Sequence, residues 1–322
     1  MKKSSLKNLI FYMTGQASWY FVNGLQMVLF PTILILILGV TPSNYGLAQV
    51  SLLAPSIFLI VLGGTIADKT DTRILLAIVH FLATLPLLLI LFSIQFGFLS
   101  FEIMIIYGLA MGSISAFVIP SRDALLTTIS QGEIQRTVIL AMLTQFGFQL
   151  TGMVFGGLAD LTGVMPLIIA QGFSLIIGGY FALKLPKPSI KKKSLDIRKI
   201  KNEITEAFIE VRKSKEIFPV SISMIMVGLC FMGNNLVTLP YITTERYGLG
   251  ASGFATVSTC FWLGTFFSNS ILALNKNLKN WGTALMVAMT SGTPILASFY
   301  FDMPFYGPVS STHLRAHEPM VD

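Results

Sequence analysis

The sequence predicts an all-α integral membrane protein. Of its 322 residues, 53% are hydrophobic and 11% are charged, whereas a soluble domain carries roughly a quarter charged residues. The mean hydropathy of +0.74 exceeds what a water-exposed surface accommodates. The apolar residues form runs of about 20 residues, the length that an α-helix needs to cross the hydrocarbon core of a bilayer.

Nine apolar runs predict nine transmembrane helices. They cover about residues 10–38, 46–66, 74–95, 101–120, 137–158, 165–184, 217–243, 252–273 and 283–301, and the breaks between them carry turn residues and charges. The basic residues before the first run resemble the start of a signal peptide, but the run is too long for one and has no small-residue cleavage site. We therefore expect it to remain as the first span.

The Lys and Arg residues predict the orientation, because basic residues tend to stay on the cytoplasmic side during insertion. With the N-terminus in the cytoplasm, all but two of the 22 Lys and Arg residues fall in cytoplasmic segments; Arg246 is predicted outside and Arg315 lies in the tail. We expect a multi-pass protein of the cytoplasmic membrane, with the lipid bilayer as its main partner.

A basic connector, residues 185–216, follows the sixth span and holds most of the net charge of +7. Nucleic-acid binding is not predicted, because this charge follows the orientation rule and faces anionic lipid. Within the connector, Ile200, Ile204 and Phe208 recur at helical spacing. This spacing predicts an amphipathic helix that lies on the membrane or on the helix bundle.

A weak internal repeat relates the segments on either side of the connector. Residues 21–31 read FVNGLQMVLFP and residues 230–240 read CFMGNNLVTLP, with glycine, valine and proline in register. The predicted domains are a six-helix bundle at 1–184, the connector at 185–216, a partial bundle of three helices at 217–302 and a polar tail at 303–322. A second half equal to the first needs three more helices, so we expect a fragment or a truncated chain.

A short motif carries a family resemblance. Residues 63–73 read GGTIADKTDTR, which resembles the loop signature of the major facilitator superfamily; Gly64, Asp68, Lys69 and Arg73 match it. Asp71 stands in place of the usual second glycine and is similar to the form found in the branch of macrolide-efflux proteins and siderophore exporters. We expect Gly64 to permit a close helix crossing and the carboxylates to pair or to cap a helix end.

Other segments resemble the same branch. Residues 119–126, IPSRDALL, resemble its turn between helices four and five, and residues 206–218, EAFIEVRKSKEIF, resemble the segment that leads into helix seven. Asp68, Lys69, Asp71 and Arg73 are predicted to have a gating or structural role, with a plain solvated loop as the alternative. Pairing of Arg122 with the Asp68 loop is a further prediction. Residues 152–157, GMVFGG, are similar to an antiporter motif, but Met153 stands where that motif has proline, so the motif by itself does not establish drug/proton antiport.

Polar residues inside predicted spans are candidates for a binding cavity, because they are costly in lipid, although many only bond to a neighbouring helix. The candidates are Asn23, Gln26, Gln145, Gln149, Asn234 and Asn235. The resemblance implies that the repeat-related helices flank a central cavity. Trp19 and Trp262 are candidates for stacking on a ligand, with anchoring at the membrane interface as the alternative.

The resemblance implies a secondary active transporter, an efflux permease that moves a small amphipathic organic molecule by alternating access. Residues 68–73 and Arg122 would fasten the cytoplasmic side in one state, and a proton or another ion would be the coupling partner. The alternative is a truncated relative that does not transport.

An enzyme is not predicted. The histidines, His80, His313 and His317, form no cluster in the sequence, and the chain has no Walker loop. Cys230 and Cys260 both lie within apolar runs, so neither a disulfide framework nor a metal site is expected. No cofactor is predicted.

Overall fold

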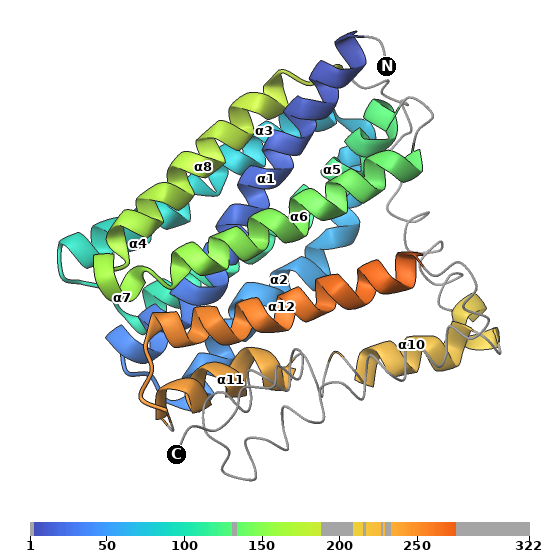
Figure 1. The fold of residues 1–322 in the computed structure, drawn as a ribbon. Coiled ribbons are helices and arrows are strands. Elements are labelled where there is room, and N and C mark those ends of the chain that lie inside the picture. Colours follow the sequence, from blue (N-terminus) through green and yellow to red (C-terminus); the bar gives the residue numbers. More distant parts are fainter. Residues whose placement is uncertain are drawn as a thin grey trace, which may run out of the picture.

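The computed structural model describes residues 3–130, 134–187, 209–214, 217–226, 228, 233–245 and 247–274, and every regular element in these ranges is helical. Figure 1 shows a bundle of long helices. The N-terminal bundle comprises α1 (Lys3–Pro31) with its π-helical continuation η1 (Thr32–Ile37), α2 (Pro42–Lys69), α3 (Thr72–Leu82), α4 (Thr84–Gln95), α5 (Phe101–Ser130), α6 (Ile134–Gly156), α7 (Ala159–Thr162) and α8 (Met165–Leu183). The C-terminal helices are α10 (Ile217–Met226), α11 (Gly233–Glu245) and α12 (Ala251–Leu274).

The all-α membrane architecture is confirmed. Within the described ranges, six helical stretches are long and apolar enough to cross a membrane: Leu6–Ile37, Pro42–Lys69, Thr72–Gln95, Phe101–Ser130, Ile134–Thr162 and Met165–Leu183. They correspond to the first six predicted spans. The seventh predicted span contains α10 and α11, and the eighth corresponds to α12. The ninth, at 283–301, most of the connector and the polar tail lie outside the described residues.

The predicted break after Pro120 is wrong, because α5 continues to Ser130. Leu125 and Ile129 are buried on one side of this extension, so packing against the bundle stabilises about three more turns. The Ser121 hydroxyl donates to the carbonyl of Phe117, within the turn where proline removes a backbone donor. The segment that resembles a turn is therefore helical.

Glycines allow the helix backbones to meet. A Cβ atom on Gly24 of α1 would overlap the carbonyl oxygen of Gln149 on α6, and one on Gly152 would overlap that of Phe21. Such small residues permit close packing in lipid, where helices gain little from the hydrophobic effect. Together they place α1 directly against α6 at the centre of the N-terminal bundle.

The close crossing predicted for Gly64 is made by Gly63. A Cβ atom on Gly63 of α2 would overlap the backbone of Ala116 on α5, whereas nothing lies within 4 Å of one on Gly64. Consecutive residues of a helix point about 100° apart, so only one of two adjacent glycines faces the neighbouring helix.

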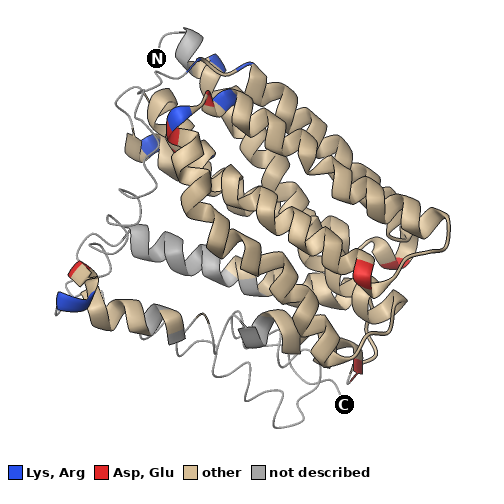
Figure 2. Ribbon diagram, turned by 180° about the vertical axis from the view of Figure 1, so that it is seen from behind, with Lys and Arg blue, Asp and Glu red and all other residues tan. Residues whose placement is uncertain are grey.

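The charges divide the bundle into two ends (Figure 2). The basic end holds the first residues of α1 and the loop between α2 and α3, with Lys7, Lys69 and Arg73. The opposite end holds the start of α5, which includes Glu102, and α7, which includes Asp160; among the residues that the structure describes, it holds no Lys or Arg.

The C-terminal helices contact the N-terminal bundle near the opposite end, and α12 diverges from α6 toward the basic end (Figure 1). Asp160 of α7 accepts hydrogen bonds from the first two backbone N–H groups of α12, those of Ala251 and Ser252, at 2.7 and 2.8 Å. The Tyr241 hydroxyl of α11 donates to the carbonyl of Val40. These contacts join the two groups of helices at one end.

Candidate substrate cavity

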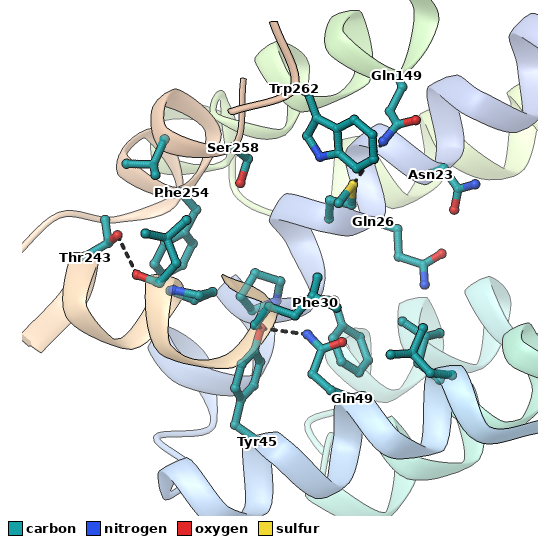
Figure 3. A pocket seen from close by; sticks show the side chains of 18 residues that line it. Asn23, Gln26, Phe30, Tyr45, Gln49, Gln149, Thr243, Phe254, Ser258 and Trp262 are labelled. Atoms are coloured by element: carbon teal, nitrogen blue, oxygen red, sulfur yellow. Dashed lines mark hydrogen bonds between the residues drawn. The ribbon is translucent and has the colours of Figure 1, made fainter. Parts of the chain in front are cut away.

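A cavity of about 320 Å³ lies between the N-terminal bundle and the C-terminal helices (Figure 3). Its walls come from α1, α2, α6, α11 and α12. The lining residues are Asn23, Gln26, Met27, Phe30, Pro31, Tyr45, Gln49, Leu52, Leu53, Gln149, Leu236, Leu239, Pro240, Thr243, Phe254, Val257, Ser258 and Trp262. The cavity therefore needs both parts of the chain.

Helical periodicity explains how each wall forms. Asn23, Met27 and Phe30 follow one another at intervals of four and three residues, so they share one face of α1. Tyr45 and Gln49 do the same on α2. Pro31 and Pro240, which the internal repeat aligns, both line the cavity.

Three of the six predicted cavity residues line it: Asn23, Gln26 and Gln149. The amide nitrogen of Gln149 donates to the sulfur of Met27 at 3.3 Å, which joins α6 to α1 at the wall. Gln145, one turn earlier on α6, is partly buried and does not line this cavity. The side chains of Asn234 and Asn235 lie outside those that the structure describes.

Tyr45 and Gln49 are the main residues that sequence reasoning missed. Gln49 Nε2 donates to the Tyr45 hydroxyl at 2.8 Å, and that hydroxyl donates to the carbonyl of Leu236 on α11 at 3.1 Å. A signal for Gln49 existed, because it is an amide within the second predicted span. Tyr45 falls in a predicted turn, and its role depends on the contact with α11.

The two tryptophans predicted to stack on a ligand have different surroundings. Trp262 of α12 lines the cavity and packs near Phe146 of α6, with ring centroids 6.2 Å apart. Trp19 is buried in the N-terminal bundle, where its ring meets His80 edge-on at 5.4 Å. Of these two side chains, Trp262 is the one that can contact a ligand in this cavity.

The described lining combines amides, hydroxyls and aromatic rings and includes no charged side chain. Apolar walls with a few placed polar groups are typical of sites for small organic molecules. The amides supply both donors and acceptors.

Comparisons with known proteins support the same fold. A sequence profile described as Major Facilitator Superfamily matches residues 12–311. The chain belongs to the major facilitator superfamily. A search of curated proteins finds no match to this sequence.

Solved structures share the major facilitator fold. The chain is similar to the nucleoside transporter NupG with a TM-score of 0.73 and 16% identity, over 96% of this chain and 78% of that one. It is also similar to an inward-facing, unoccupied structure of a bacterial homologue of the human lysosomal transporter Spinster, with a TM-score of 0.66 and 14% identity, over 97% of this chain and 73% of that one. At these identities the likeness shows the fold alone.

The loop at residues 68–73, which carries the superfamily motif, is stabilised by contacts between its own residues. Asp71 Oδ1 accepts from the backbone N–H of Arg73 at 3.1 Å and so caps α3, and its Oδ2 pairs with the Arg73 guanidinium at 3.0 Å. Asp68 is exposed and Lys69 partly buried in the last turn of α2. Asp71 therefore both caps and pairs within the loop.

Arg122 does not join this loop. Its guanidinium lies over the ring of Tyr20 at 4.8 Å, and its carbonyl accepts a hydrogen bond from the Tyr12 hydroxyl at 3.3 Å. Within the described ranges, no carboxylate of residues 68–71 pairs with it. The prediction of that pairing is wrong for this state, because the side chain turns toward the aromatic face of α1.

Proposed function

We propose that this transporter exports a small amphipathic organic molecule across the cytoplasmic membrane by alternating access. The observation that carries the proposal is the uncharged cavity of amides and aromatic rings between two groups of helices that meet at one end. The loop resemblance to macrolide-efflux proteins and siderophore exporters supports the export direction and the amphipathic class of substrate.

The basic end would face the cytoplasm, because Lys and Arg tend to remain there during insertion. The hydrogen bonds of Asp160 and Tyr241 would then close the outer side, and α12 diverges from α6 toward the inner side. This state would receive its cargo from the cytoplasm, as an exporter requires.

Transport would be driven by a proton or another ion, because the sequence has no Walker loop for nucleotide hydrolysis. The described lining holds no carboxylate. We therefore place the coupling ion outside the described part of this cavity.

Accumulation assays test the proposal. Cells that express the chain should retain less radiolabelled erythromycin or chloramphenicol than cells with an empty vector, and a protonophore should abolish the difference. Gln149→Ala should raise the substrate concentration at half-maximal transport about two- to tenfold, because a hydrogen bond contributes about 0.5–1.5 kcal/mol.

Gln95→Ala is the matched control, since Gln95 is exposed at the end of α4 and does not line the cavity. It should transport like the parent. Uptake of radiolabelled uridine without export of either antibiotic would favour a nucleoside carrier instead. No transport of any of the three probes would argue for the inert relative.

A further inference from the structure

A second hollow lies on the outside of the N-terminal bundle. It is a groove of about 570 Å³ between α1, α6 and α8, lined by Leu9, Ile10, Met13, Thr14, Ala17, Ser18, Phe21, Thr144, Phe148, Thr151, Ser174 and Ile177. Figure 1 shows α1 between α6 and α8. Ile10, Phe148 and Ile177 on its rim are exposed. Because all three helices span the membrane, the groove faces hydrocarbon rather than water.

The hydroxyl groups in the groove are already bonded within the protein. Thr14 donates to the carbonyl of Ile10 at 2.9 Å, Thr144 to that of Leu140 at 2.8 Å and Thr151 to that of Gly147 at 2.8 Å. The surface that the groove offers is therefore almost wholly apolar. Such a surface accommodates a hydrocarbon chain and gives no recognition to a polar solute.

Two lysines continue the groove toward the basic end. Lys7 precedes Ile10 by three residues and Thr14 by seven, so it shares their face of α1. Lys184 follows Ile177 by seven residues and lies just beyond the last turn of α8. Both lysines are exposed.

Each lysine lies over an aromatic ring of its own helix, and ring contacts between Phe11 and Phe181 join the two helices. The ammonium of Lys7 lies over Phe11 at 5.5 Å from the ring centroid, and that of Lys184 over Tyr180 at 5.1 Å. Phe11 packs on Phe181 with centroids 5.4 Å apart, and Phe181 packs on Tyr180 at 5.5 Å. This chain of contacts joins α1 to α8 where the groove meets the membrane surface.

We propose that the groove binds an anionic phospholipid of the bilayer, with an acyl chain along α1 and the phosphate at Lys7 and Lys184. The charge complementarity selects the headgroup, and the apolar lining selects the chain. Each lysine near the membrane surface contributes about fivefold to binding of an anionic lipid. The proposal is independent of which substrate the central cavity carries.

Native mass spectrometry of the delipidated full chain tests this, with palmitoyl-oleoyl phosphatidylglycerol and phosphatidylcholine as probes. The parent should retain phosphatidylglycerol in preference to phosphatidylcholine. The double variant Lys7→Gln/Lys184→Gln should lose roughly 25-fold of that preference, whereas Arg212→Gln/Lys213→Gln removes the same charge away from the groove and should lose none.

A second pair of variants tests the acyl chain. Thr14→Phe fills the groove and should lower retention of both lipids at least threefold, whereas Thr127→Phe on α5 should not. Equal retention of the two lipids by the parent would overturn the proposal. The proposal would also be overturned if the lysine double variant and its control retained phosphatidylglycerol equally. The same holds if Thr14→Phe and Thr127→Phe retained both lipids equally. Both comparisons use samples that remain monodisperse in detergent.

Discussion

At the residue scale, one carboxylate connects the two groups of helices. Both oxygens of Asp160 accept backbone N–H groups at the start of α12, where the helix dipole favours a negative charge. A Cβ atom on Gly250 would overlap this carboxylate, so the glycine before α12 makes room for it.

We expect Asp160→Ala to open the outer side. Loss of a cap of this kind costs about 1 kcal/mol, which corresponds to about a fivefold shift between two states. The reporter is Ser258→Cys, a cavity residue, in a chain whose Cys230 and Cys260 are replaced by serine. Its labelling by a membrane-impermeant maleimide added to intact cells should accelerate about fivefold.

Glu102→Ala is the control, because Glu102 is another acid, in the first turn of α5, and its carboxylate bonds to Ser100. Its labelling rate should equal that of the parent reporter. Equal rates for Asp160→Ala and Glu102→Ala would show that the cap does not hold the outer side closed.

At the element scale, the rotation of each helix decides which small residues matter. Gly63 and Gly64 are neighbours on α2, yet only Gly63 faces the backbone of α5. Gly15 of α1 lies against Gly178 of α8. A Cβ atom on Gly178 would overlap Ser18 of α1 and His80 of α3, so this glycine also allows a close approach of helices. Helix crossings of this kind set the shape of the N-terminal bundle.

Gly63→Ala should destabilise the protein, because its methyl group would overlap the carbonyl of Ala116. The expected loss is about 1–3 kcal/mol, which should appear as a lower midpoint of thermal unfolding in detergent. Gly64→Ala should leave the midpoint unchanged or raise it slightly. Alanine lowers the conformational entropy of the unfolded chain, and its methyl group would have no atom within 4 Å in the folded protein. Equal midpoints for the two variants would contradict the assigned crossing.

At the scale of the whole molecule, the contacts at the opposite end and the divergence toward the basic end imply access from one side. The Ser258→Cys reporter should therefore react faster with the impermeant maleimide in everted vesicles than in intact cells, by tenfold or more. The opposite order would mean that the basic end faces outward or that the outward-open state dominates in cells.

Two loop positions calibrate this measurement. Thr70→Cys lies in the loop between α2 and α3 and should be labelled only in everted vesicles. Ser100→Cys lies between α4 and α5 and should be labelled only in intact cells. Together they separate the orientation of the chain from its conformational state.

Local composition was enough to predict the first six spans and the all-α membrane fold. A bilayer requires about 20 apolar residues in a helix that satisfies its own backbone, and this requirement can be read from each segment alone. Turn residues and charges after Pro120 predicted the end of α5 too early, because burial of Leu125 and Ile129 outweighs this local preference for a break.

The sequence by itself determined which polar side chains lie within the membrane, but only the tertiary structure decided which of them meet. Gln49 and Gln145 are the same residue type in two apolar helices, yet Gln49 lines the cavity and Gln145 does not. Composition is a property of a segment, whereas the direction of a side chain depends on how its helix is rotated and packed against its neighbours.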